Sequence, residues 1–117
     1  MNWHKDTISV QTTGKCLVPC TDQISNRLDQ WQVTEGICHL FIQHTSASLV
    51  INESYDPSAR QDMETFMKKI APEGQSWHRH TLEGPDDSPS HMRAMLTATS
   101  LSIPVDRGKL NLGRWQG

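Results

Sequence analysis

The sequence predicts an α+β domain in which helices and strands follow one another without the regular alternation of a parallel fold. Two apolar stripes have helical spacing, and two β-branched segments, residues 7–13 and 99–105, have the character of strands. The predicted order, β-α-β-β-α-loop-α-β-β, favours a mixed or antiparallel sheet with two to three helices. The length of 117 residues, without a linker or repeat, favours one domain over residues 1–117.

The first half of the chain predicts one helix and three strands. Residues 7–13 alternate between polar and β-branched side chains and end at Gly14, as a half-buried strand would. Thr21 is a candidate N-cap for a helix whose Ile24, Leu28 and Trp31 share one face. Residues 37–43 and 47–52 are short and rich in Ile, Val, Leu and Phe, so we expect two further strands.

The second half predicts two helices before the closing strands. Asp56-Pro57 is an N-cap followed by proline, and apolar residues then recur at helical spacing up to Ile70. Ser88-Pro89 repeats this start signal before a shorter helix. Residues 99–105 predict a strand, in which Pro104 favours a sheet edge or a bulge because it has no N–H to donate. A turn then leads into a last segment, residues 110–115.

Charge and composition exclude several classes of protein. A net charge of -2 with scattered Lys and Arg gives no footprint for nucleic acid. No run approaches the roughly 18 apolar residues of a membrane span, so no membrane partner is expected. The first residues lack the apolar region of a signal peptide, and three cysteines make no disulfide framework. The sequence therefore predicts a cytoplasmic protein.

Two polar stretches carry the chemistry of a site. Residues 79–91 combine two histidines with three carboxylates, and residues 44–48 place His44 at the end of a predicted strand. Such residue types bind metals and move protons: carboxylate oxygens suit Mg²⁺, and with imidazoles they suit Zn²⁺ or Mn²⁺. Simpler readings stay open. His44 could bond only to a neighbouring hydroxyl, His91 could be an exposed first-turn residue, and Asp86-Asp87 could be turn formers.

Four ordered motifs resemble the YjbQ-like family, which is also called the secondary thiamine-phosphate synthase family. They are His44-Thr-Ser-Ala-Ser-Leu-Val-Ile-Asn-Glu53, Asp56-Pro57 with its helix, His80-Thr-Leu-Glu-Gly-Pro-Asp-Asp-Ser-Pro-Ser-His91, and the closing segments 100–105 and 108–117. The resemblance implies an α+β fold that assembles as a homotrimer, with polar clefts near subunit boundaries. It also implies a further C-terminal strand that this sequence does not contain.

The resemblance further implies a weak thiamine-phosphate synthase, which joins a pyrimidine diphosphate to a thiazole phosphate and releases pyrophosphate. The matching catalytic positions are His44, His80, Asp87 and His91, which we expect to hold a divalent metal (Mg, Zn or Mn). The expected binding residues for a small phosphorylated substrate are Thr45, Ser46, Asn52, Glu53, Trp115 and Gln116. Two alternatives remain: a metal-dependent hydrolase of a small phosphorylated or cyclic substrate, and a non-catalytic module that binds an anion or other ligand.

Overall fold

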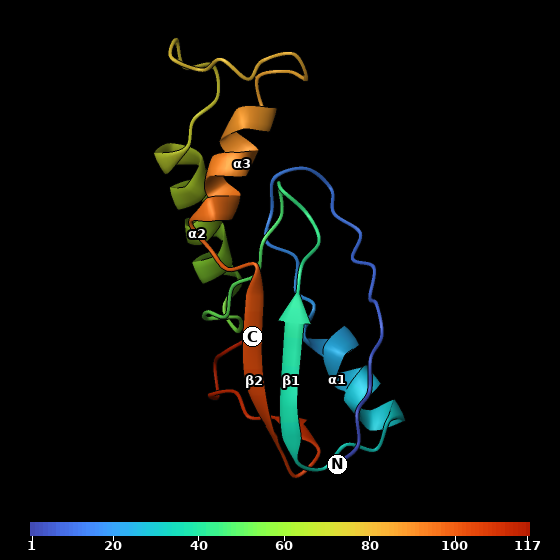
Figure 1. The fold of residues 1–117 in the computed structure, drawn as a ribbon. Helices are drawn as coiled ribbons and strands as arrows, with labels where there is room; N and C mark the ends of the chain where they lie inside the picture. Colours follow the sequence, from blue (N-terminus) through green and yellow to red (C-terminus); the bar gives the residue numbers. More distant parts are fainter.

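A three-stranded antiparallel sheet and three helices make up the computed structural model, which describes all 117 residues. The helices are α1 (Thr21–Gln30), α2 (Pro57–Ile70) and α3 (Asp87–Met95), and the strands are β1 (Gly36–Phe41), β2 (Ser100–Asp106) and β3 (Lys109–Leu110). The strand order is β1-β2-β3. Figure 1 shows α1 beside the sheet and α2 with α3 beyond the start of β2. The predicted α+β class is confirmed, with antiparallel pairing throughout.

The three predicted helices form because their signals are local. The Asp56 carboxylate accepts the backbone N–H of Ser58, and Pro57 follows it at the first position of α2. In α3 the helix begins at Asp87, two residues before the predicted first helical residue, Pro89, which lies in the first turn and is fully buried. A first-turn proline removes only an N–H that has no partner within the helix. No helix is long and apolar enough to cross a membrane.

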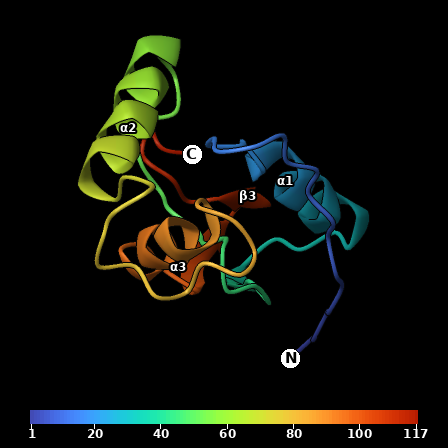
Figure 2. The ribbon, with the colours of Figure 1, turned by 90° about the horizontal axis from the view of Figure 1, so that it is seen from above.

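Two of the predicted strands are wrong. Residues 7–13 are extended but pair with no neighbour, and residues 47–52 form only a bridge between Leu49 and Ala98. The last segment is a strand only at Lys109–Leu110. A strand needs a partner for its backbone N–H and C=O groups, and propensity alone does not supply one. Figure 2 shows the N-terminal segment running past α1, away from the other helices.

Pro104 lies in the central strand, and the geometry explains how β2 tolerates it. β3 pairs only with Val105 and Asp106, so β2 has no neighbouring strand on the β3 side at Pro104. The Pro104 carbonyl accepts the N–H of Asn111 on that side, and in a strand the N and C=O of one residue point the same way. The missing N–H therefore removes no bond to β1, and Pro104 sits at what is locally an edge.

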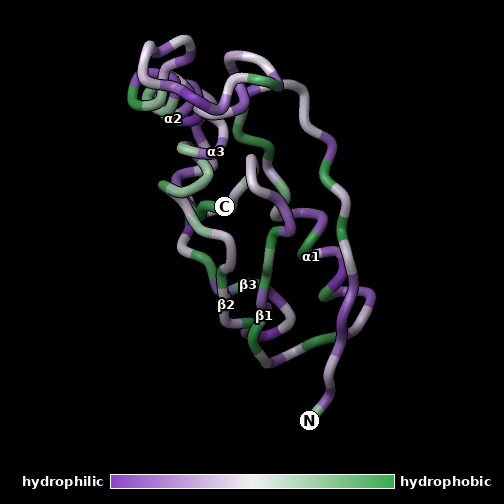
Figure 3. The backbone as a smooth tube through the Cα atoms, turned by 45° about the horizontal axis from the view of Figure 1, so that its top comes forward, coloured by the Kyte–Doolittle hydropathy of each residue, from purple (hydrophilic) through white to green (hydrophobic).

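The core is small and one-sided. The buried apolar residues are Ile24 and Leu28 of α1, Ile103 and Val105 of β2, and Ala71. On the outer face of the sheet, Ile37 and Phe41 of β1 remain 68% and 65% exposed. Figure 3 shows hydrophobic residues continuing along β1, whereas the loop between α2 and α3 is largely hydrophilic. Ile37 and Phe41 thus have no partner on this face in the isolated chain, whereas His39 between them bonds to Ser102 across the sheet.

Arg93 holds α3 against α2. Its guanidinium donates to the carbonyls of Met67 at 3.3 Å and Ala71 at 2.6 Å, at the C-terminal end of α2, where the Met67 carbonyl also accepts the Ala71 N–H. We expect Arg93→Ala to lower the free energy of unfolding by about 2 kcal/mol, since two bonds from a charged donor are lost. Chemical denaturation followed by circular dichroism measures this. Arg79→Ala, at an exposed residue with no side-chain bond, is the control; equal losses would contradict the prediction.

Candidate functional site

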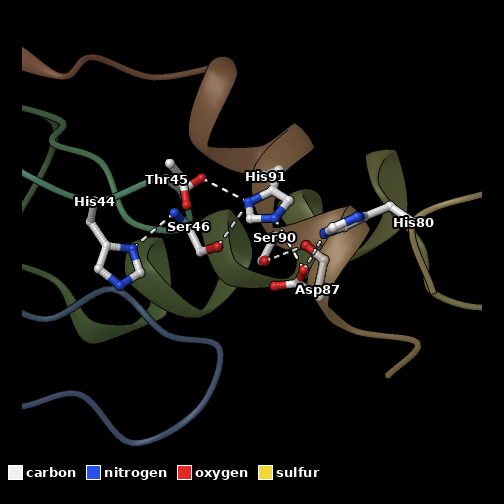
Figure 4. A network of polar contacts seen from close by, with 7 residues as sticks. All are labelled: His44, Thr45, Ser46, His80, Asp87, Ser90 and His91. Atoms are coloured by element: carbon white, nitrogen blue, oxygen red, sulfur yellow. Dashed lines mark hydrogen bonds and ion pairs between the residues drawn. The ribbon is translucent and has the colours of Figure 1, made fainter. Parts of the chain in front are cut away.

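Three side chains from the loop before α3 and from α3 itself converge on one point. His80 Nε2 lies 2.7 Å and His91 Nε2 lies 3.1 Å from the same oxygen, Oδ2 of Asp87. The three atoms all lie within 4.8 Å of one another, and Figure 4 shows both rings turned toward the carboxylate. Two imidazoles and one carboxylate are a donor set that zinc and other divalent transition metals accept, and we call these residues the His-Asp-His cluster.

Local structure brings the cluster together. Asp87 and His91 are four residues apart on α3, so their side chains lie on the same helical face. His80 reaches them because the loop turns back: the N–H of Gly84 donates to the Thr81 carbonyl, and Gly84 has φ +106°, a conformation that side chains rarely allow. The loop turn and the helix face thus build the cluster from residues within one short stretch of chain.

The second ring nitrogen of His91 is fixed by residues 45 and 46. Nδ1 lies 3.0 Å from the Thr45 carbonyl oxygen and 2.9 Å from Ser46 Oγ. A carbonyl can only accept, so Nδ1 carries a proton, and Nε2 is the nitrogen left for a metal. A histidine ligand is commonly oriented this way, by a bond from its other nitrogen to a carbonyl. Because Nδ1 is a donor here, it cannot also take the Ser46 proton as a general base.

Without a metal, the same contacts favour a protonated His91. The bond to the Thr45 carbonyl is the main cause that raises the pKa of His91 above its ordinary value of 6.5, against the loss of hydration that lowers it. The charges of Asp87 and Glu83 raise this pKa further. Glu83 belongs to the environment of the cluster and was not among the predicted site residues. The signal in the sequence was its place among the three carboxylates of residues 79–91.

The raised pKa predicts a pH dependence of the metal-free protein. Because the pKa of His91 is raised in the folded state, its protonation stabilises that state below pH 6.5, and this contribution is lost as pH rises through the folded pKa. Imidazole NMR across pH 5–9 should show His91 titrating above 6.5, and Asp87→Asn should lower the midpoint. A midpoint at or below 6.5 in the unsubstituted protein would contradict this.

His44 lies outside the cluster. Its Nδ1 accepts the backbone N–H of Ser46 at 2.9 Å, so neutral His44 carries its proton on Nε2 and has no nitrogen lone pair free for a metal. The structure therefore groups three of the four expected ligands and separates His44. The bond from the Ser46 N–H to His44 Nδ1 causes this, and residue spacing did not reveal it. Thr45 and Ser46 reach the cluster through their contacts with His91.

The other expected binding residues form a second group near the start of α2. The backbones of Asn52 and Gly117 exchange two hydrogen bonds of 3.1 Å, and Glu53 bridges to Gln116. The Trp115 ring lies 4.7 Å from the Tyr55 ring between centroids. No hydrogen bond or ion pair joins these residues to the His-Asp-His cluster. Within one subunit, the expected substrate-binding set is therefore divided in two.

Fold and cluster together define a class: a small α+β protein with a potential metal centre of two histidines and one aspartate. The model of the family UPF0047 protein YjbQ-like matches residues 6–117. The UPF0047 protein YjbQ of Escherichia coli O157:H7 is 40% identical over 116 residues, which is 98% of this chain and 83% of that protein. The chain belongs to the YjbQ-like UPF0047 family.

Solved structures of relatives agree with the fold. The conserved hypothetical protein TT1486 from Thermus thermophilus matches with a TM-score of 0.83 and 32% identity, over 93% of this chain and 82% of that one. An uncharacterized conserved protein of the same family from Clostridium acetobutylicum matches with a TM-score of 0.81 and 30% identity, over 92% and 81%. The resemblance noted from the motifs is confirmed.

The comparisons also correct one expectation. The matching relatives are described as UPF0047 proteins, and the Clostridium acetobutylicum relative as uncharacterized. Neither thiamine-phosphate synthase nor transferase is among these descriptions. The terms thiamine-phosphate synthase and transferase, drawn from the family resemblance, are therefore replaced by the UPF0047 family description, and the function, which these descriptions do not test, is inferred below from the site itself.

Proposed function

We propose that the protein is a metal-dependent hydrolase of small phosphorylated or cyclic substrates. The observation that carries the proposal is the convergence of His80 Nε2, Asp87 Oδ2 and His91 Nε2 within 4.8 Å. Three protein ligands leave a coordination position for water, as in hydrolytic zinc sites, whereas structural sites use four. The donor set favours zinc over magnesium, which prefers oxygen ligands.

The residues around the cluster have distinct roles. A metal ion held there supplies Lewis acidity, lowering the pKa of bound water to about 7 and neutralising negative charge on a phosphoryl oxygen. Thr45 holds the His91 ring in orientation through its carbonyl. Glu83, whose charge raises the pKa of His91, is the carboxylate that we propose would accept a proton from water held at the site. These roles require no lysine or arginine, and the His-Asp-His cluster contains neither residue.

One observation favours the second candidate, a module that binds a metal or an anion without chemistry. The His80 side chain is 57% exposed, whereas catalytic sites usually exclude water from the reacting groups. Closure by another subunit or by the substrate would remove this objection. Both functions predict metal binding, but only the hydrolase predicts turnover of a substrate, so an experiment can separate them.

The test combines metal content with activity. Zinc binding to the chelator-treated protein is measured by titration calorimetry, and hydrolysis is assayed with p-nitrophenyl phosphate, bis-p-nitrophenyl phosphate and 2′,3′-cyclic nucleotides. We expect one zinc per chain and zinc-dependent release of product from at least one substrate, with loss of turnover in Glu83→Gln at unchanged zinc content. Zinc binding without turnover would favour the binding module, and no zinc binding would exclude both metal proposals.

We also propose that the protein assembles as a homotrimer, as the family resemblance implies. The chain exposes 9009 Å², whereas a compact monomer of 13.2 kDa exposes about 6,400 Å². Its radius of gyration is 16.4 Å, against about 13.4 Å for a compact chain of this length. The excess of roughly 2,600 Å² is of the size that obligate assemblies bury, and the apolar outer face of β1 is part of it.

A further inference from the structure

A hollow of about 250 Å³ adjoins His80 on the side of the loop between α2 and α3. Besides His80, it is lined by Gly74, Gln75, His78, Thr81, Gly84 and Pro85. None of these side chains is a hydrophobic one, and none is lysine, arginine, aspartate or glutamate. The volume corresponds to roughly eight water molecules, so a group the size of a small sugar ring fits.

The hollow offers two polar side chains whose hydrogen-bonding capacity is unused. Gln75 donates from Nε2 to the Glu73 carbonyl, which fixes the amide and leaves Oε1 as a free acceptor. The Thr81 hydroxyl has no protein partner. His78 also lines the hollow, but its Nε2 is buried out of reach of solvent and so takes no part in the contacts with a ligand. A ligand that both donates and accepts hydrogen bonds would satisfy these groups.

The charge pattern selects the class of ligand. A phosphate would need cationic donors, and no lysine or arginine lines this hollow. Hydroxyl groups both donate and accept, and they match an amide oxygen and a hydroxyl without requiring charge. The anionic part of a substrate would instead bind at the His-Asp-His cluster. His80 belongs both to this cluster and to the lining of the hollow, so the two adjoin.

We propose that this hollow is the specificity site for an uncharged, hydroxyl-rich part of the substrate, such as the sugar of a sugar phosphate. The proposal rests on the proposed metal site for the phosphoryl end. Gln75 and Thr81 contact the hydroxyl groups, while the phosphoryl group lies at the cluster. The substrate class is thereby narrowed from any small phosphate ester to one whose alcohol carries several hydroxyls.

The test compares ligands that share a phosphate monoester and differ in the alcohol. Binding of D-ribose 5-phosphate and of methyl phosphate to the zinc-loaded protein is measured by calorimetry. We expect ribose 5-phosphate to bind roughly tenfold more tightly, since about two hydrogen bonds are added. Thr81→Val and Gln75→Leu should each reduce this advantage while leaving methyl phosphate binding and zinc content unchanged. Ser76→Ala, at an exposed neighbour outside the hollow, is the matched control.

Two failures are distinguishable. If zinc binds but the two phosphates bind equally, or if both variants keep the advantage, the hollow is not the specificity site. If zinc does not bind, the metal site fails, and the hollow is tested alone by titrating metal-free protein with D-ribose and following the His78 imidazole by NMR. A shift that Thr81→Val abolishes would support the hollow, and no shift would overturn it.

Discussion

Asp87→Asn is expected to abolish zinc binding, because Oδ2 of Asp87 is the atom on which both histidines converge. The amide keeps the size of the side chain but removes its charge, and the neutral amide oxygen that remains is a much weaker zinc ligand than a carboxylate. Changing a supporting residue of a metal site typically costs 10–100-fold in affinity, so losing a direct ligand should cost more than roughly 100-fold. Titration calorimetry with a competing chelator measures the dissociation constant for zinc.

The neighbouring Asp86→Asn is the matched control. It makes the same chemical change one residue away, at the N-cap of α3, where the carboxylate forms no side-chain cap. We expect the dissociation constant of Asp86→Asn for zinc to lie within a few-fold of that of the unsubstituted protein. The variant should also fold equally well. If both variants lost zinc to the same extent, the effect would be one of helix stability or net charge, and the His-Asp-His cluster would not be the site.

Phe41→Asp is expected to separate the subunits of the proposed trimer. Phe41 lies on the outer face of β1, 65% exposed in the isolated chain, and its partner across the sheet is Ser100. Burying a phenylalanine contributes about 1.5–3 kcal/mol, and a buried unpaired carboxylate opposes association much more strongly. Sedimentation equilibrium should then give a species near 13.2 kDa in place of the trimer.

Phe41→Leu is the control for this change, because it keeps an apolar side chain at the same position. We expect the leucine variant to sediment as the unsubstituted protein does. Circular dichroism of both variants separates dissociation from unfolding, since Phe41 is not part of the buried core. A Phe41→Asp protein that remains assembled would place the contact between subunits elsewhere on the surface.

The sequence predicted the elements whose signals are local and missed those that depend on distant partners. Asp56-Pro57 marked the start of α2 to the residue and Ser88-Pro89 that of α3 to within two residues, because a cap and a first-turn proline act within one turn. The segment 7–13 has strand composition but no neighbouring strand in the structure. Composition describes what a segment can do, and pairing depends on the rest of the fold.

The candidate site shows the same division. His80, Asp87 and His91 come from one stretch of chain, so their spacing was informative and the structure brings them together. His44 was expected to join them, but its Nδ1 accepts a bond from the backbone two residues on, which composition cannot reveal. Asn52 and Gln116 lie together near α2 rather than at the cluster, because the chain returns there after β3.

The position of β1 in the sheet has a consequence for handling the protein. β1 is the first strand of the order β1-β2-β3, so one side of it has no strand beside it, and its N–H and C=O groups there are open to another extended segment. Such an edge, flanked by exposed Ile37 and Phe41, is a template for aggregation. Subunits released from the proposed trimer should therefore precipitate or form fibrils more readily than assembled ones.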